Sequence, residues 1–172
     1  MKKLDKPTSI QTHQIHPFPP LYNAESRVLI LGSFPSVKSR EQQFYYGHPQ
    51  NRFWKVIAAV FGQPVPSSIE EKKALILSSR LALWDTIASC DIVGSSDSSI
   101  RNVKVNDLAG IMSGSSIRHI ITNGGTSYAL YQRYQQPLTG IEAVRLPSTS
   151  PANAAWDLER LIQAWGILGS WI

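Results

Sequence analysis

Short apolar runs alternate with segments of helical periodicity along this chain. An unbroken apolar run is typical of a strand buried on both faces of a sheet. Such a run occurs at 28–31, and further strands are predicted at 81–84, 117–122 and 141–146. Helical spacing predicts the helices 51–61, 69–79, 105–112, one from residue 126 or 127 to 134, and 155–165.

Local signals support two of these helix boundaries. Gly62 follows the predicted helix 51–61 and is a plausible residue for its C-terminal cap. Ser68, with Glu71 three residues later, resembles a capping box at the start of the helix 69–79.

The alternation of strands and helices predicts the fold class. Connections too long for hairpins require a parallel sheet covered on both faces. We therefore predict an α/β fold, a three-layer α/β/α sandwich with a central four-stranded parallel sheet. Residues 1–20, which end in a proline-rich segment, are expected to form an extended arm on the domain, and residues 21–172 a single domain.

Composition narrows the class of protein. A chain of 172 residues with 42% hydrophobic content has the size of one globular domain. The net charge of +5 favours polyanionic partners. The single cysteine, Cys90, cannot form an internal disulfide, and no apolar run reaches the length of a membrane span. We expect a cytoplasmic monomer without membrane attachment.

The candidate chemistry lies in the loops that follow the predicted strands. Ligands of parallel α/β sheets bind outside the carboxyl ends of the strands. This rule selects four loops, at 32–51, 85–99, 123–126 and 147–153.

The loop 32–51 is long and rich in aromatic residues. Tyr45 and Tyr46 could stack on a flat ring, with the amide of Asn51 beside it. The structural alternatives are packing of the tyrosines under the loop and capping of the next helix by Asn51. Gly32 and Pro35 alone are more typical of an ordinary turn.

Two other loops carry polar groups. Ser148, Thr149 and Ser150 lie between two prolines and are suited to hold phosphate oxygens, although a plain surface turn is the alternative. The amide of Asn123 can offer a donor and an acceptor to a base edge, but it is also a common turn residue.

The sequence gives little support to a general-base carboxylate, a metal site or another known enzyme motif. Asp85 and Asp97 invite a general-base assignment, yet without a visible partner each is more often a cap or turn residue. The four histidines form no metal pattern, and only His48 lies in a loop of interest. The chain lacks the P-loop, the dinucleotide G-x-G-x-x-G and the G-x-S-x-G elbow.

Five segments together resemble the uracil-DNA glycosylase superfamily. They are LGSFP at 31–35, YYGHPQNRFW at 45–54, LWD at 83–85, NG at 123–124 and LPSTSP at 146–151. Within the superfamily the chain is most similar to the hypoxanthine-DNA (deoxyinosine) glycosylases, with the mismatch-specific uracil glycosylases next. The similarity extends from about residue 14 to 165, and it implies the four-stranded fold predicted above.

The resemblance implies roles for particular residues. Asn51 matches the catalytic candidate of the motif H-P-x-N-x-F-W, and Tyr46 falls where relatives stack an aromatic ring on the extruded base. Phe34 stands where the mismatch-specific relatives have the asparagine that positions water, which argues against a uracil-specific enzyme. The expected base-binding residues are Gly32, Ser33, Phe34, Pro35, Tyr46 and Asn123. The expected DNA-binding residues are Lys38, Arg40, His48, Ser148, Thr149 and Ser150.

The resemblance therefore predicts hydrolysis of an N-glycosidic bond in DNA, with hypoxanthine as the flipped-out base and with no metal or other cofactor. An amide cannot accept a proton at neutral pH, so Asn51 would either orient water or donate to the leaving base. Three alternatives stay open: a mismatch-specific uracil-DNA glycosylase, a DNA-binding relative without activity, and a hydrolase of free nucleosides.

Overall fold

Four parallel strands form the centre of the computed structural model, which describes residues 10–172. In chain order they are β2 (Val28–Gly32), β3 (Leu81–Asp85), β6 (His119–Asn123) and β7 (Ala143–Leu146). Their order in the sheet is β3-β2-β6-β7, and every neighbouring pair is parallel. The predicted four-stranded parallel sheet is confirmed, and β6 and β7 each begin two residues later than predicted.

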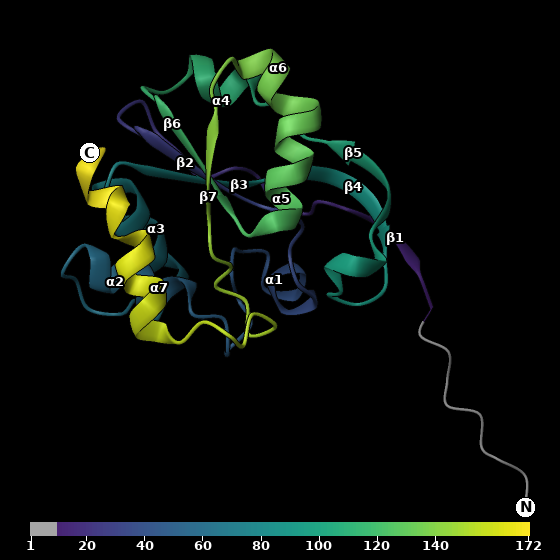
Figure 1. Ribbon diagram of the computed structural model, residues 1–172, viewed down its shortest axis with the longest axis horizontal. Coiled ribbons are helices and arrows are strands. Elements are labelled where there is room, and N and C mark those ends of the chain that lie inside the picture. The colour runs from purple at the N-terminus through teal and green to yellow at the C-terminus, as the bar shows by residue number, and fades with distance from the viewer. Residues whose placement is uncertain (1–9) are drawn as a thin grey trace, which may run out of the picture.

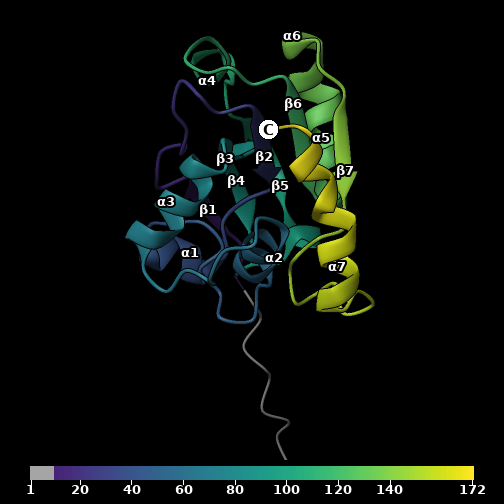
Figure 2. The ribbon, with the colours of Figure 1, turned by 90° about the vertical axis from the view of Figure 1, so that its left-hand side faces the viewer.

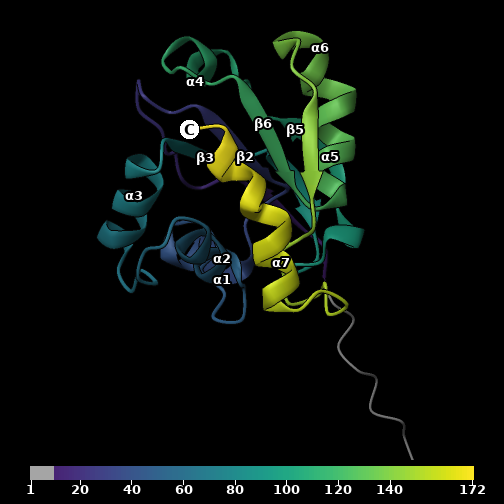
Figure 3. The same ribbon diagram turned by 60° about the vertical axis from the view of Figure 1, so that its left-hand side comes forward.

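Helices cover both faces of this sheet, and the alternation of side chains in β2 shows why (Figure 1). Val28 and Ile30 belong to the larger hydrophobic cluster, whereas Leu29 and Leu31 belong to a second one. The larger cluster packs against α2 (Phe53–Val60), α3 (Ile69–Ser78) and α7 (Leu158–Trp165). The second packs against α4 (Ala109–Ser113) and the segment after α5 (Gly125–Leu130). Figure 3 shows α2 and α7 on one side of the sheet and α5 on the other, as the three-layer prediction requires.

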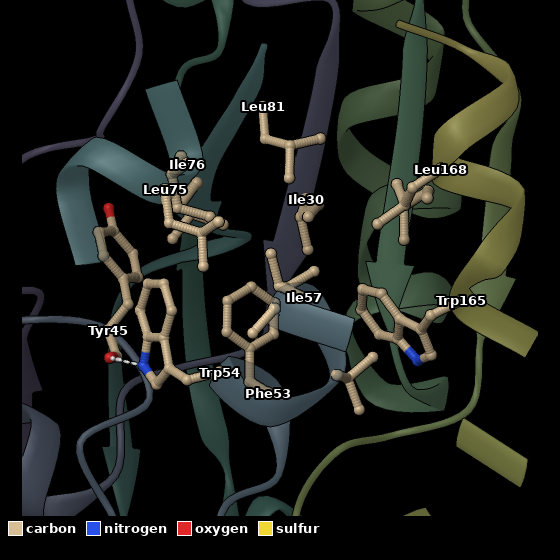
Figure 4. Packing of buried hydrophobic residues seen from close by; sticks show 14 of the residues in the cluster. Ile30, Tyr45, Phe53, Trp54, Ile57, Leu75, Ile76, Leu81, Trp165 and Leu168 are labelled. Carbon is tan, nitrogen blue, oxygen red and sulfur yellow. Dashed lines mark hydrogen bonds between the residues drawn. The ribbon is translucent and has the colours of Figure 1, made fainter. Parts of the chain in front are cut away.

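Aromatic residues dominate the larger cluster, and Figure 4 shows how they meet. Phe53 is fully buried and packs edge-on against Trp54 and Trp165, with ring centroids 4.9 and 6.0 Å apart. The indole N–H of Trp54 donates to the carbonyl of Tyr45 at 3.2 Å. Burial of each large apolar side chain stabilises the fold by about 1.5–3 kcal/mol, so this packing anchors the aromatic loop to α2.

A second, three-stranded antiparallel sheet lies beside α5 (Figure 1). It contains β1 (Thr12–Ile15), β4 (Ile87–Ile92) and β5 (Arg101–Val105), in the order β1-β4-β5. The prediction of a loop over 85–99 is therefore wrong, because β4 begins at Ile87, two residues after Asp85. Its pattern of buried Ile and Cys beside polar residues was obscured by the serine-rich turn that follows, and its partner β1 comes from a distant part of the chain.

Several helix boundaries also differ from the predictions. Val105 ends β5, so the helix predicted over 105–112 is confined to α4. The helix predicted to reach residue 134 is α5 followed by a π-helical turn, Tyr131–Gln135, and by α6 (Gln136–Thr139). Short helical turns at Asp97–Ser99 and Gly166–Ser170 were not predicted, nor was α1 (Val37–Gln42), which Ser36 caps.

Of the two capping features predicted at helix ends, the glycine after α2 is present and the capping box before α3 is formed only in part. Gly62 has a φ of 62°, which suits a glycine just beyond the end of α2. Ser68 Oγ accepts from the N–H of Glu71 at 3.1 Å, but the Glu71 carboxylate accepts from Ser67 N–H and not from Ser68. Only half of the capping box is formed.

The N-terminal segment is part of the second sheet where it is described. Thr12–Ile15 pair with β4, while residues 1–9 of the predicted arm lie outside the described residues. Within residues 10–172, no helix combines the length and apolar character needed to cross a membrane.

Candidate active site

A pocket of about 320 Å³ opens at the carboxyl ends of the parallel strands. All four strands contribute to its wall through their last residue or the loop that follows. Nineteen residues form it: Gly32, Ser33, Phe34, Pro35, Ser36, Ser39, Tyr45, Tyr46, His48, Asn51, Asp85, Ser95, Asp97, Asn123, Ser148, Thr149, Ser150, Pro151 and Ala152. Figure 2 shows the end of the domain where α1, α2 and α7 come together below the sheet.

Asn51 lies just before α2, and the hydrogen bonds of its side chain fix which end of the amide is free. Its Oδ1 accepts from the backbone N–H of Phe53 and from the hydroxyl of Thr149, both at 2.9 Å. A backbone N–H can only donate, so the oxygen must face Phe53. The Nδ2 group makes no hydrogen bond with the described residues, and Asn51 lines the pocket. Arg52, not Asn51, is the N-cap of α2.

Thr149 links Asn51 to Asn123. The Thr149 hydroxyl donates to Asn51 and accepts from Asn123 Nδ2 at 3.0 Å. Asn123 Oδ1 accepts from the backbone N–H of Thr149 at 3.0 Å. Thr149 is completely buried, so its hydroxyl is not available to a phosphate group. The pairing also uses both polar ends of the Asn123 amide, which was expected to contact a base edge.

Arg52 holds the fourth loop in place, a role that the sequence analysis missed. Its guanidinium donates to four backbone carbonyls, which belong to Thr149, Ser150, Asn153 and Trp156. The backbone N–H of Arg52 also donates to Thr149 at 3.1 Å. The planar fork of an arginine suits several acceptors at once. Because Arg52 is adjacent to Asn51, the loop and Asn51 form one unit.

The hydroxyls of Ser148 and Ser150 have a different arrangement. Ser148 Oγ accepts from Ser150 N–H at 3.1 Å, and Ser150 Oγ accepts from Ala152 N–H at 3.2 Å. Each hydroxyl thus stiffens the loop and keeps its own hydrogen free to donate. Both residues are partly exposed in the pocket wall.

Tyr46 has one ring face covered. It stacks on Phe53 with centroids 3.9 Å apart, so a flat ligand can stack only on its other face. Its φ of 52° is uncommon for a bulky residue and indicates backbone strain in the pocket wall. The Tyr46 hydroxyl is buried and has no hydrogen-bond partner among residues 10–172.

The loop after β2 supplies apolar and polar walls. Phe34 is 8% exposed and packs with Ile87, Cys90 and Ile92 while it lines the pocket. Ser33 Oγ donates to the carboxylate of Asp97 at 3.0 Å, at the exposed rim. Gly32 and Pro35 also line the pocket, as expected.

Three residues expected to bind DNA differ in exposure. Lys38 is exposed, and its Nζ lies 3.4 Å from Glu41 Oε2. Arg40 is half-buried: it donates to the carbonyl of Gly94, its guanidinium lies over the ring of Phe34, and burial lowers its pKa. His48 lines the pocket, and its Nδ1 accepts from Gln50 N–H, which makes Nε2 the donor of the neutral ring.

A buried histidine–carboxylate pair lies behind the pocket wall, which only its Asp85 member lines. His16 Nε2 lies 2.6 Å from Asp85 Oδ2, and both side chains are almost fully buried. No local pattern in the sequence indicates this pair, because the two residues are 69 positions apart. Among residues 10–172, no three His, Cys, Asp or Glu side chains gather into a group that could hold a metal ion.

Together, the parallel sheet and the pocket at the carboxyl ends of its strands define an α/β domain of the kind that binds its ligand at this edge of the sheet. Residues 19–168 match the family model of the uracil DNA glycosylase superfamily, and the chain belongs to this superfamily. It is accordingly a DNA glycosylase, a hydrolase that acts on DNA.

Relatives with assigned names agree with this family. A hypoxanthine DNA glycosylase of Methanosarcina acetivorans is 33% identical over 144 residues, which cover 83% of this chain and 90% of the relative. A hypoxanthine DNA glycosylase of Methanosarcina barkeri is 26% identical over 137 residues, with 79% and 86% covered. The solution NMR structure of a proposed uracil DNA glycosylase from Methanosarcina acetivorans superposes with a TM-score of 0.75 at 30% identity and covers 91% of this chain and 99% of that one. The resemblance stated from the sequence motifs is confirmed.

Proposed function

We propose that this DNA glycosylase releases hypoxanthine from deoxyinosine in DNA and that Asn51 is its catalytic residue. The observation that carries the proposal is the free Nδ2 group of Asn51 on the pocket wall, with its Oδ1 already bonded. The names of the relatives support the substrate. Phe34, which cannot position water by hydrogen bonding, argues against a pyrimidine-specific pocket of the mismatch type.

The role of Asn51 follows from its free group. Cleavage of the N-glycosidic bond places negative charge on the leaving base and positive charge on the sugar. A fixed N–H donor stabilises the negative charge as it develops, without reorganisation during the step. The Asn51 oxygen, which already accepts two hydrogen bonds, is poorly placed to orient water. We therefore assign Asn51 the role of a donor to the departing purine.

The energetics of base extrusion are compatible with this pocket. Flipping a nucleotide out of the duplex costs a few kcal/mol, least for a poorly paired base. Stacking on an aromatic ring of the pocket wall such as Phe34 would recover about 1–3 kcal/mol. The free hydroxyl hydrogens of Ser148 and Ser150 would hold phosphate oxygens.

A single-turnover assay tests the proposed function. Duplexes that contain inosine, uracil or xanthine are incubated with excess enzyme, and base release is measured. Fastest release from the inosine duplex is expected. Faster release of uracil would instead identify a uracil-DNA glycosylase, and no release from any duplex would identify a DNA-binding relative. Free deoxyinosine is expected to remain intact.

Replacing Thr149 with valine is expected to slow base release about 10-fold or more while duplex binding changes little. Valine keeps the volume of threonine but cannot donate to Asn51 or accept from Asn123. The loss of these bonds should also reduce the free energy of unfolding by about 1–3 kcal/mol. Thr149→Ser keeps the hydroxyl and is the matched control. Equal rates for the two variants would contradict the positioning role of the hydroxyl.

Salt dependence distinguishes Lys38 from Arg40. The logarithm of the DNA-binding constant should fall with the logarithm of salt concentration at about −0.9 per neutralised phosphate. Lys38→Ala should lower that slope by about one unit, because its ammonium group is exposed. Arg40→Ala should leave the slope nearly unchanged, since its guanidinium is engaged with Gly94 and Phe34. The reverse pattern in a binding titration would show that Arg40 is the phosphate contact.

We also propose that the enzyme acts as a cytoplasmic monomer. The lone cysteine, Cys90, is buried and free, which suits a reducing compartment.

A further inference from the structure

Asp85 occupies a position at the pocket that only a neighbouring glycine permits. It is the last residue of β3, pairs in register with Gly32 of β2, and is 4% exposed. A Cβ atom at Gly32 would collide with Asp85 Oδ1. The bare backbone of Gly32 therefore leaves the space in which this carboxylate oxygen lies.

The hydrogen bond with His16 engages one oxygen of the Asp85 carboxyl group, Oδ2. His16 Nδ1 is buried and has no partner among residues 10–172. A hydrogen on Nδ1 would be buried and unpaired at a substantial free-energy cost, so we place the ring hydrogen on Nε2, which donates it to Asp85 Oδ2.

The second oxygen of Asp85 is the free acceptor in this part of the pocket. Oδ1 makes no hydrogen bond with the described residues, and Asp85 lines the pocket. The hydroxyl of Tyr46 lies 3.2 Å from the same Cβ position at Gly32 and has no partner. Burial and the nearby Asp85 carboxylate raise the pKa of Tyr46, so this hydroxyl keeps its hydrogen. A free acceptor and a free donor thus lie side by side.

We propose that Asp85 discriminates hypoxanthine from adenine, and uracil from cytosine, by accepting the ring N–H of the flipped base, while the Tyr46 hydroxyl donates to the adjacent carbonyl oxygen. This inference rests on the proposed function and names the chemical edge that the pocket selects. Hypoxanthine presents N1–H beside the C6 carbonyl, and uracil presents N3–H beside the C4 carbonyl. Adenine and cytosine present a lone pair on the ring nitrogen and an amino group instead.

This arrangement rejects adenine and cytosine, the bases whose deamination yields hypoxanthine and uracil, through repulsion. Adenine N1 would direct a lone pair at the Asp85 carboxylate and leave that buried charge unpaired. A site built to bond an N–H group strongly disfavours an analogue that lacks it, because its polar groups are then left unsatisfied. The same carboxylate would also exclude cytosine, whose N3 carries a lone pair. The discrimination therefore applies to purines and pyrimidines alike.

The test measures binding separately from catalysis. Duplexes carry hypoxanthine or adenine on a 2′-fluoroarabino sugar, whose fluorine resists cleavage by disfavouring positive charge on the sugar. Wild-type enzyme is expected to bind the hypoxanthine duplex more tightly. Asp85→Asn can keep its oxygen on His16 and turn its NH₂ group toward the base. The ratio of the adenine Kd to the hypoxanthine Kd should then fall by at least about 10-fold.

Matched variants separate this effect from charge and packing. Asp97→Asn removes a carboxylate of the same pocket whose oxygens are bonded to Ser33, and it should leave the ratio unchanged. Tyr46→Phe should lower the ratio by a smaller factor than Asp85→Asn. Tyr45→Phe, which removes a hydroxyl bonded to the Pro19 carbonyl, should not lower it.

Failure of the role proposed for Asp85 can be told apart from failure of the proposed substrate. An unchanged ratio in a folded Asp85→Asn variant, or a wild-type enzyme that binds both duplexes equally, overturns the role of Asp85. An unchanged ratio in Tyr46→Phe overturns the role of its hydroxyl. If wild-type enzyme releases uracil and not hypoxanthine, the proposed substrate fails, and the same variants are then measured on uracil and cytosine duplexes, where the predicted change in ratio is the same.

Discussion

Asn51→Ala is expected to lower the single-turnover rate of base release at least about 100-fold, while the variant still folds and binds duplex DNA. The substitution removes the free Nδ2 donor from the pocket wall. It also removes the oxygen that accepts from Phe53 and Thr149, which should cost about 1 kcal/mol of stability. Measurement of rate, duplex affinity and thermal unfolding on one preparation separates these effects.

Two further variants sharpen this test. Asn51→Asp keeps an oxygen for Phe53 and Thr149 but has no NH₂ group, so it should be about as slow as Asn51→Ala. An Asp variant close to wild type would mean that Asn51 acts through its oxygen. Asn23→Ala is the control: Asn23 Oδ1 also accepts a backbone N–H two residues ahead, from Glu25 at 2.9 Å, but lies outside the pocket wall. Its rate should stay unchanged.

Arg52→Lys is expected to destabilise the protein by about 2–4 kcal/mol, because one ammonium group cannot reach all four carbonyls that the guanidinium now holds. For a chain of this size, the melting temperature should fall by roughly 5–15 °C. Base release should slow as well, since the loop that carries Thr149 would no longer be fixed beside Asn51. Calorimetry and the single-turnover assay measure the two effects.

Arg160→Lys provides a matched control for this prediction. Arg160 donates to one carbonyl of the same region, at Ala155, and lies exposed over the ring of Trp156. Its replacement should change the melting temperature by less than about 2 °C, as is usual for surface substitutions. Similar melting temperatures for the two variants would show that Arg52 does not hold the loop.

The sequence determined the parallel sheet and the location of the pocket. The apolar runs of β2 and β3 are contiguous and almost completely buried, so a local pattern of a few residues predicts these two strands. The position of Asn51 could be predicted for the same reason, because a continuous motif carries it. The second sheet could not, since β4 is polar at alternate positions and pairs with Thr12–Ile15, far away in the chain.

Tertiary structure alone decided what each polar group in the pocket can do. Thr149 was expected to hold phosphate, but its burial between Asn51 and Asn123 makes it a link between two loops. Asp85 looked like a turn residue until the fold brought His16 to it across 69 positions. The physical reason is that a side chain's available donors and acceptors depend on which partners the rest of the chain supplies, and hydrogen bonds between distant segments leave no periodic trace in the sequence.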